Sequence, residues 1–355
     1  MKGIILHGGH GTRLRPLTHT GPKQLLPIAN KPMSEYCLES LRDAGITDIA
    51  IIIGGIGSNK VEEYYGDGKD FGVKLSYIQQ DSPKGIAHAV RLCKTFVGKE
   101  KFVVFLGDNI IQKNIHEYAD DFKNSNDDAS ILLCEVDNPS QFGIAEIENN
   151  KIIKLVEKPK IPKTNLAVTG IYFLTPIIFD LIDNLKPSWR NEYEIVDALQ
   201  MLLDTNKKIR YYVITDFWKD TGTPDDILQA NQIILENTKP YFYGIKDDDV
   251  IIEGNVMIGE GTIIKNKSKI IGPVIIGKNC IISDESFVGP NTSIADNVNI
   301  SHCTVKNSII MPNCIINCDV KIKNSIISSN SKIFKKDSTS EERVFLLGEG
   351  TKIIL

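Results

Sequence analysis

Short apolar runs alternate with stretches of helical periodicity over the first 240 residues. Apolar runs predict strands, and apolar positions spaced three and four apart predict helices. We expect strands at 3–6, 49–54, 74–78 and 102–107, and helices at 32–45, 85–96 and 193–206. This alternation is typical of an α/β fold with a sheet covered on both faces. Ligands of such sheets bind beyond the carboxyl ends of the strands.

The apolar period changes to six after residue 250. An aliphatic residue stands at every sixth position, and the residue four positions after each is small or β-branched. Neither a helix nor a hairpin sheet has this period, but a triangular coil with three short faces per turn does. The phase slips at Lys306 and resumes at Ile310. The aliphatic positions are Ile252, Ile258, Ile264, Ile270, Ile276, Ile282, Val288, Ile294 and Ile300, and, after the slip, Ile310, Ile316 and Ile322.

The repeat resembles the left-handed parallel β-helix built from hexapeptides. We therefore predict an α/β domain over 1–240, a β-helix domain over 250–335, and a C-terminal cap or closing strand over 336–355. Coils that end in solvent leave a surface on which another chain can stack. A homo-oligomer with contacts through the β-helix is the expected assembly.

Composition limits the classes of partner. The net charge of −4 argues against nucleic acid as the main partner. No apolar run reaches the length of about 18 residues that a transmembrane helix needs. The N-terminus also lacks the apolar core and cleavage site of a signal peptide. Seven scattered cysteines without paired C-x-x-C motifs favour reduced thiols over disulfides or a zinc site. These features predict a cytoplasmic protein without a membrane partner.

The loop after the first strand, "LHGGHGTRLRPLT", combines glycines with cations. A glycine-rich turn presents backbone N–H groups that bind phosphate oxygens at close range. The loop does not match the P-loop pattern, because no Gly-Lys-Ser/Thr follows. It does not match the dinucleotide pattern either, because Leu14 stands where the third glycine would be. Arg13 in the loop and Lys23 nearby can both bind phosphates, so we predict a phosphate site of a different kind.

Eight motifs along the chain resemble one enzyme family: "LHGGHGTRLRPLT", "PKQLLPIANKPM", "QQDSPKGIAHAV", "LGDN", "FGIAEI", "VEKPK", "AVTGIYF" and "WKDTG". These motifs resemble the sugar-1-phosphate nucleotidylyltransferases, and most closely the long-form glucose-1-phosphate thymidylyltransferases with a β-helix tail. The resemblance implies a Rossmann-like catalytic domain over 1–240, with a mixed, mostly parallel sheet. It implies transfer of a nucleotidyl group from dTTP to glucose 1-phosphate, which gives dTDP-glucose and pyrophosphate. The sugar phosphate would attack the α-phosphate in line, in a reaction that depends on Mg²⁺.

The same resemblance implies roles for individual residues. Arg13 and Lys23 would grip the triphosphate, while Gln24, Gln80 and Gly85 would read the base edge. A glutamine amide suits this task because it both donates and accepts hydrogen bonds. The full nucleotide-binding set is Leu6, Gly8, Gly9, Gly11, Thr12, Arg13, Gln24, Gln80 and Gly85.

Two aspartates at strand ends are the expected metal ligands. Asp108 follows "FVVFLG" and Asp220 follows "DFWK". Magnesium prefers one or two carboxylates together with phosphate oxygens and water. A helix N-cap is the alternative role for either aspartate, and Thr223 competes with Asp220 for it. The expected catalytic set is Arg13, Lys23, Asp108, Lys158 and Asp220.

In the sugar pocket the resemblance places Glu157 on the sugar hydroxyls and Lys158 on the sugar phosphate. Arg190 is either a second phosphate ligand or a solvated residue before a helix, and the sequence favours neither. The full sugar-phosphate-binding set is Asn109, Gly143, Glu157, Lys158, Val168, Gly170, Tyr172 and Arg190.

Two alternative functions remain open at this point. The donor could be UTP, because thymine and uracil differ by one methyl group. Hexapeptide β-helices also often carry acyltransferases, which usually use a histidine base; His302 is the candidate, but the tyrosine and Gly-Asp elements expected around it are missing. His7, His10 and His88 stand where the family usually has other residues. Packing or exposure is the expected role of each.

Overall fold

A computed structural model describes residues 1–9 and 11–334. The predicted cap at 336–355 lies outside the described residues. Contacts divide the chain into two compact units. The first unit comprises Met1–Gly11, Thr18–Leu25 and Met33–Asp220, and the second comprises Thr12–Leu17, Leu26–Pro32 and the chain from Thr221 onward. The sequence-based domain limits at 240 and 250 stay a prediction.

A mixed sheet forms the centre of the first unit. Its strand order is β10-β9-β11-β6-β1-β4-β5, with β8 paired to β11 and β12 paired to β8. Strands β4, β5 and β6 run parallel to β1, whereas β11 runs antiparallel to β6. The bounds are β1 Lys2–Leu6, β4 Asp48–Ile53, β5 Lys74–Gln79, β6 Phe102–Leu106, β8 Ala129–Glu135, β9 Gly143–Glu148, β10 Lys151–Glu157, β11 Leu166–Leu174 and β12 Ile209–Ile214.

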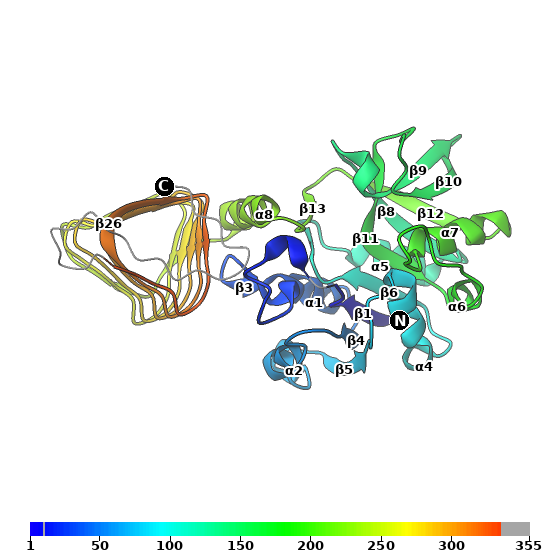
Figure 1. Cartoon of the computed structure of the whole chain (residues 1–355), viewed down its shortest axis with the longest axis horizontal. Coiled ribbons are helices and arrows are strands. Elements are labelled where there is room, and N and C mark those ends of the chain that lie inside the picture. Colours follow the sequence, from blue (N-terminus) through cyan, green and yellow to red (C-terminus); the bar gives the residue numbers. More distant parts are fainter. Residues whose placement is uncertain (10, 335–355) are drawn as a thin grey trace. The chain divides into compact units, whose positions relative to one another are not determined.

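Helices cover both faces of this sheet (Figure 1). Side chains of a strand alternate between faces, so Ile4 belongs to one apolar core and Ile5 to the other. Helices α3, α6 and α7 contribute to the first core, and α1, α2 and α5 to the second. The predicted α/β fold class is confirmed. The bounds are α1 Met33–Asp43, α2 Asn59–Tyr65, α3 Ile86–Leu92, α4 Lys94–Val97, α5 His116–Asn124, α6 Ile177–Ile182 and α7 Ile195–Asp204.

The second unit contains a parallel β-helix, which the six-residue period predicts. Seen along its axis, the coils outline a triangle beside helix α8 (Pro224–Asn237) (Figure 1). One face is the sheet β14-β17-β20-β23-β25-β27, and the other two faces join through β24 and β26. The strands of the first face are β14 Tyr241–Phe242, β17 Val256–Ile258, β20 Val274–Ile276, β23 Thr292–Ile294, β25 Ile309–Ile310 and β27 Ile326–Ile327. Those of the other two are β15 Ile245–Lys246, β16 Ile251–Glu253, β18 Ile263–Ile264, β19 Lys269–Ile271, β21 Ile281–Ser283, β22 Phe287–Val288, β24 Asn299–Lys306, β26 Ile315–Lys323 and β28 Lys332–Phe334.

The aliphatic column fills the β-helix interior, but its phase slips earlier than the sequence suggests. Ile300 pairs with Ile282, and Val305 pairs with Val288. The inward positions are therefore five residues apart at this point instead of six. β24 consequently runs as one strand around a corner, with an irregularity between Ser301 and Cys303. Val305 is fully buried where the six-residue period places Lys306, and the buried Cys303 takes the inward place expected for Thr304, which is left half-buried on the outer surface.

Helix α8 and a short hairpin pack on the first face of the β-helix. The hairpin consists of β2 (Pro27–Ile28) and β3 (Lys31–Pro32). The Oδ1 atom of Asn231 in α8 accepts from the Ala29 backbone N–H at 2.8 Å and from the Ser293 hydroxyl at 2.6 Å. Leu235 of α8 packs with Met257. These contacts fix segment 26–32, which directly follows Lys23 and Gln24 in the chain, on the β-helix.

Candidate active site

The glycine loop leaves the carboxyl end of β1, which pairs with β4 on one side and β6 on the other. This is the position where the strand order reverses, and open α/β sheets bind ligands there. Gly9 and Gly11 have φ angles of +94° and +58°. A Cβ on Gly11 would lie 2.9 Å from the Cγ2 atom of Thr18, whose hydroxyl donates to the Gly11 carbonyl at 2.8 Å. Close packing and backbone conformation thus both require glycine at position 11.

Two glutamine amides lie beside Gly8. The Nε2 atom of Gln24 donates to the Gly8 carbonyl at 3.0 Å, and a Cβ built on Gly8 would lie 3.5 Å from Oε1 of Gln80. Both side chains are buried. Within the described residues, Oε1 of Gln24 has no hydrogen-bond partner. The structure thus places both glutamines beside the glycine loop with one buried acceptor unsatisfied, and their role in reading a base stays a prediction.

A hydrogen bond from Gln80 to His88 fixes the Gln80 amide. The sequence does not predict this contact. The Nδ1 atom of His88 lies 3.0 Å from Nε2 of Gln80, so the imidazole accepts when Nδ1 is unprotonated. Burial, aided by the nearby Arg91 and Lys84, lowers the pKa of His88 and keeps the ring neutral. His7 is also buried, and desolvation lowers its pKa to about 3 despite the opposing charge of Asp108. His10 lies outside the described residues.

Gly85 begins α3 at a close backbone crossing. Its φ angle is +99°, and a Cβ would lie 2.5 Å from the Tyr193 carbonyl oxygen. The Tyr193 backbone bonds to both sides of this glycine: its N–H donates to Lys84 at 2.7 Å, and its carbonyl accepts from Ala87 at 3.0 Å. Gly85 thus joins the expected base-reading loop to the segment that precedes α7. The predicted helix at 85–96 is in fact two short helices, α3 and α4.

Asp108 lies just beyond the carboxyl end of β6 and forms an ion pair with Lys23. Burial disfavours the charged carboxylate, but the Lys23 ammonium and the Asn109 amide outweigh it and hold the pKa of Asp108 below its usual range. Asn109 is almost fully buried and orients this carboxylate, because its Nδ2 donates to Oδ1 of Asp108 at 3.1 Å. The Oδ1 atom of Asn109 accepts from the Gly170 backbone and from the Trp218 indole, at 3.1 and 2.8 Å.

A two-stranded ribbon brings Asp220 next to Asp108. Strands β7 (Asn109–Ile111) and β13 (Trp218–Asp220) are antiparallel, and Asp220 is the register partner of Asn109. Neither aspartate caps a helix, because Asp108 precedes a strand and Thr223 forms the capping box of α8. The described residues contain no group of three or more His, Cys, Asp or Glu side chains arranged for a metal. Two neighbouring carboxylates nevertheless suit Mg²⁺, which takes its remaining ligands from phosphates and water.

Charged side chains gather around Glu157 at the end of β10. The Nζ atom of Lys158 lies 3.7 Å from Oε1 of Glu157, and Nη1 of Arg190 lies 3.5 Å from the same oxygen. Arg190 also pairs with Glu192, and its Nε lies 3.6 Å from Oε1 of Glu194. Arg190 is therefore part of the Glu157 cluster. Its role as a second phosphate ligand stays a prediction.

Burial raises the pKa of Glu157 to about 7, and the negative charge of Glu194 adds to the shift. Lys158 and Arg190 oppose the shift only in part. Glu194 is 3% exposed and accepts from the Ser188 hydroxyl at 2.8 Å. Its place before α7 in "NEYEIV" is the only sequence signal that it gives. Sequence reasoning therefore missed Glu194, as it missed Trp218.

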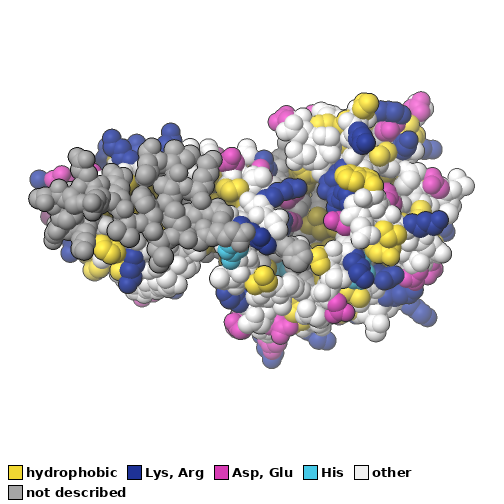
Figure 2. Space-filling view, viewed as in Figure 1, with side chains coloured by type: hydrophobic (Ala, Val, Ile, Leu, Met, Phe, Trp, Pro, Cys, Tyr) yellow, Lys and Arg dark blue, Asp and Glu magenta, His cyan; other side chains and the backbone are white. Residues whose placement is uncertain are grey.

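The remaining predicted sugar-pocket residues line β9 and β11. A Cβ on Gly143 would lie 3.1 Å from Oε2 of Glu157, and a Cβ on Gly170 would lie 2.6 Å from Oδ1 of Asn109. Both glycines thus leave room for functional side chains. Val168 and Tyr172 are buried on the same strand. Leu6 is buried at the end of β1. Figure 2 shows a hollow in the surface of the first unit, with apolar side chains inside it and charged ones around it.

Thr12 and Arg13 are exposed in a short 3₁₀ helix, Thr12–Leu14, which groups with the second unit. Their phosphate-binding roles therefore stay predictions. All seven cysteines are free thiols. Among the described residues, no helix combines the length and apolarity needed to cross a bilayer.

A glycine loop at the β1 switch point, a paired lysine and aspartate, and a second aspartate brought alongside define a nucleotide-handling site. The chain belongs to the nucleotidyl transferase family, whose model matches residues 2–237. Residues 270–353 match the GMPPB C-terminal domain.

Several named proteins are similar to this chain over most of its length. The glucose-1-phosphate thymidylyltransferase of Streptomyces antibioticus is 43% identical over 88% of this chain and 87% of its own length. The low-salt glycan biosynthesis nucleotidyltransferase Agl11 of Haloferax volcanii is 42% identical over the same shares. The bifunctional protein GlmU of Methanococcus maripaludis is 37% identical over 88% of this chain and 74% of its own. A Bacillus anthracis crystal structure with sucrose, provisionally named a glucose-1-phosphate thymidylyltransferase, is 43% identical. It covers 66% of this chain and 94% of its own, with a TM-score of 0.63.

Proposed function

We propose that the protein transfers a thymidylyl group from dTTP to glucose 1-phosphate and releases pyrophosphate. The observation that carries the proposal is the joint placement of the Gln24 and Gln80 amides beside Gly8 and of the Lys23–Asp108 pair beyond β6. A pyrimidine ring with carbonyl oxygens and an N–H can satisfy the buried acceptor of Gln24. Relatives that carry the thymidylyltransferase name support the same donor and acceptor.

Positioning and charge neutralisation are the main tasks of this site. A sugar phosphate oxygen attacks the α-phosphorus as the bond to pyrophosphate breaks, so no side chain has to generate the nucleophile. Lys23 and Arg13 bind the triphosphate, and Lys158 holds the sugar phosphate against it. Holding reactants in line contributes up to roughly 7–11 kcal/mol in favourable cases. Glu157 accepts hydrogen bonds from sugar hydroxyls when it is ionised.

The neighbouring carboxylates of Asp108 and Asp220 would hold Mg²⁺, the divalent ion that this family generally uses. When bound, the ion neutralises charge on the reacting phosphates. In the structure Lys23 forms an ion pair with Asp108. This pair keeps the buried carboxylate ionised and places an ammonium group beside the position of the phosphates.

UTP is the alternative donor. The name of the Haloferax relative states a nucleotidyltransferase without naming the base. A single methyl group allows discrimination of only about 1–3 kcal/mol. The buried Gln24 and Gln80 amides fit both bases.

A second activity in the β-helix has weaker support. The relatives named bifunctional keep it open, but His302 is 61% exposed, with Nδ1 4.0 Å from Oδ2 of Asp284. We therefore assign the β-helix to assembly, as a homo-oligomer contact. A cytoplasmic location is part of the proposal, because scattered cysteines without paired motifs favour reduced thiols.

A pyrophosphate-release panel tests the function. dTTP, UTP, GTP and ATP are each combined with glucose, galactose, mannose and N-acetylglucosamine 1-phosphates in the presence of Mg²⁺. We expect the highest kcat/KM for dTTP with glucose 1-phosphate. Activity with UTP alone would reject only the thymidylyl assignment. No release with any pair would reject the enzyme assignment.

A further inference from the structure

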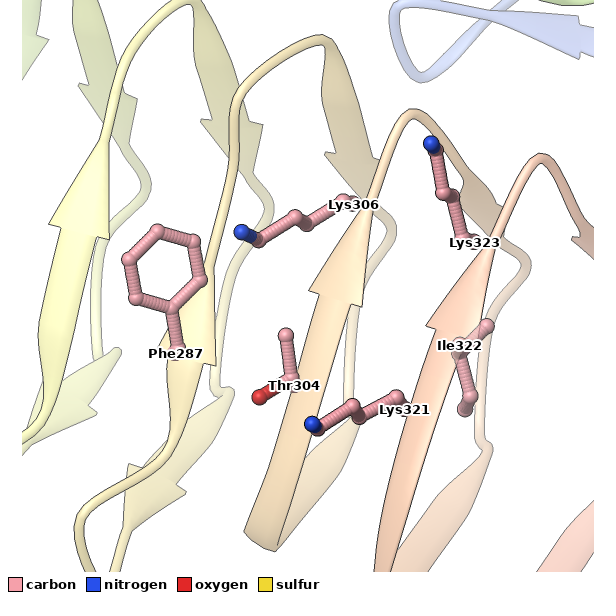
Figure 3. Close-up of a pocket in the computed structure, with 6 residues that line it drawn as sticks. All are labelled: Phe287, Thr304, Lys306, Lys321, Ile322 and Lys323. Atoms are coloured by element: carbon pink, nitrogen blue, oxygen red, sulfur yellow. The ribbon is translucent and has the colours of Figure 1, made fainter.

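A groove on the outer surface of the β-helix collects cations and one aromatic ring. Three successive coils form it, through β22, the second half of β24 and the second half of β26 (Figure 3). Its volume is about 410 Å³. The lining residues are Phe287, Thr304, Lys306, Lys321, Ile322 and Lys323. The site lies within the second unit and shares no residue with the nucleotide site described above.

Strand register explains why the polar residues face the same way. Phe287, Thr304 and Lys321 are register partners on successive coils, and Lys306 is the partner of Lys323. Alternation along each strand turns Val305 inward and the residues on both sides of it outward. The shortened repeat between Ile300 and Val305 thus brings Thr304 and Lys306 to the surface. The groove results from the same phase slip that shapes β24.

Among the described residues, the three lysines have no carboxylate partner to neutralise them, although many other lysines have one. The Nζ atom of Lys306 lies 4.5 Å from the centre of the Phe287 ring. Figure 3 shows Lys321 extending toward the Thr304 hydroxyl. Lys306 and Lys323 are register partners on adjacent strands, and an anion in the groove would offset the repulsion between like charges at such positions.

We propose that this groove binds the di- or triphosphate group of a small ligand. Strands of adjacent coils lie about 4.8 Å apart, so ammonium groups from neighbouring coils can contact oxygens of successive phosphates in one chain. Lysine serves phosphate as a flexible point charge. A hydroxyl at Thr304 adds a donor, and the volume lies in the range of small-ligand pockets. Nucleoside triphosphates and inorganic pyrophosphate share this chemistry, and binding experiments can separate them.

Binding stoichiometry provides the test, with the full-length chain and inorganic pyrophosphate as the probe. Isothermal titration should show two sites per chain for the native protein. The double variant Lys321→Ala/Lys323→Ala should keep one site. A matched variant, Lys278→Ala/Lys332→Ala, removes exposed β-helix lysines outside the groove and should keep both. An unchanged number of sites in the groove variant would overturn the proposal.

A second pair of substitutions separates the groove from the proposed transferase site. Arg13→Ala/Lys23→Ala should abolish the other pyrophosphate site and leave the groove site intact. If the protein proves inactive in nucleotidyl transfer, the groove proposal can therefore still be tested. If the groove binds no pyrophosphate, the proposed transfer activity can likewise still be tested. Repeating the titration with dTTP and with thymidine identifies the ligand part that binds. Binding of thymidine at the groove without a phosphate would count against the proposal.

Thermal unfolding without ligand tests the other source of negative charge, the chain's own Glu341 and Glu342, which lie outside the described residues. If only a bound ligand neutralises these lysines, Lys321→Ala/Lys323→Ala removes repulsion between like charges in the free protein. Its Tm without ligand should then equal or exceed the native value. Pyrophosphate should then raise the Tm of Arg13→Ala/Lys23→Ala but not that of the chain carrying all four substitutions. If these glutamates neutralise the groove, the lysine substitutions lower Tm without ligand, which would overturn the proposal.

Discussion

At the residue scale, Glu157 should make sugar-phosphate binding depend on pH near neutrality. Its pKa is raised to about 7 by burial and by Glu194. Only the ionised form accepts charge-assisted hydrogen bonds from sugar hydroxyls. We expect KM for the sugar 1-phosphate to fall about three- to tenfold as the pH rises from 6 to 8. Steady-state kinetics over this range, at fixed ionic strength and saturating nucleotide, measures the effect.

Glu194→Gln provides the matched change for this prediction. Removing the neighbouring negative charge should lower the pKa of Glu157 and shift the KM profile toward acid pH, with little change in kcat. Glu157→Gln should flatten the profile. The sign for stability is fixed as well. A raised carboxyl pKa stabilises the fold below the unfolded value and loses that contribution as the pH rises to about 7. An unshifted profile in Glu194→Gln would contradict this coupling.

The two strand-end aspartates lead to a second residue-scale prediction. Asp108→Asn and Asp220→Asn should each lower kcat by about 10²-fold or more, because each removes charge that matters most in the transition state. Asp216→Asn, an exposed change two residues before Trp218, serves as the control. Kinetics at several Mg²⁺ concentrations measures the loss. Near-native turnover at saturating Mg²⁺ would show that the substituted aspartate is not a ligand.

What the sequence reveals of the site depends on how local each signal is. Asp108 and Gly11 are recognisable because strand-end chemistry is encoded within a few neighbouring residues. The roles of Glu194 and His88 could not be assigned from the sequence. Glu194 contacts Arg190, which also contacts Glu157, and His88 contacts Gln80. Only the folded chain brings these side chains together. A buried charge and a surface charge are the same letters in a sequence. Arg190 illustrates the point, since its contacts with Glu157, Glu192 and Glu194 cannot be read from the sequence.

At the element scale, asparagines at one corner of the β-helix stabilise the turns between strands. One column consists of Asn279, Asn297, Asn313 and Asn330, whose φ angles lie between +54° and +63°. Asparagine tolerates this left-handed conformation better than other side chains do. Asn297 also donates from Nδ2 to Oδ1 of Asn313 at 3.2 Å. The column thus joins successive coils at their corners.

Substitution in this column should weaken the β-helix. Asn297→Val places a β-branched residue in the left-handed region and should cost about 1–2 kcal/mol of unfolding free energy. Asn299→Val is the matched control, because Asn299 is also exposed but lies in strand β24. Urea unfolding of both variants gives the difference. Equal stabilities would mean that corner conformation contributes little.

The elements show where periodicity suffices and where it does not. The aliphatic register up to Ile300 predicts the β-helix core, because each inward position repeats the same environment. It fails after Ile300, because a five-residue step turns Val305 inward where the six-residue period places Lys306. The helix expected at 85–96 divides at Cys93 for a similar reason. Apolar spacing alone does not mark where the backbone turns.

At the scale of the whole molecule, the three faces of the β-helix differ in what covers them. The first face packs against α8 and the hairpin 27–32. The third carries the lysine groove. The second presents four isoleucines of one register column, Ile245, Ile263, Ile281 and Ile315, which are 38–66% exposed. Asn299 stands between Ile281 and Ile315 in this column. We expect this exposed apolar face to contact another copy of the chain.

The isoleucine column gives a sharper test of assembly than removal of the tail. Truncation after residue 245 would also uncover Leu235 and the 26–32 segment next to Lys23, so lost activity would have two causes. Ile263→Lys/Ile281→Lys leaves these contacts in place and should convert the oligomer to smaller species, because charge on a buried contact is unfavourable. Ile251→Lys, an equally exposed change on the third face, should leave the assembly intact. Light scattering after gel filtration gives the mass, and turnover per chain should stay within about twofold, because the matched catalytic motifs lie before residue 223. An unchanged mass in the double variant would exclude this face as the contact between chains.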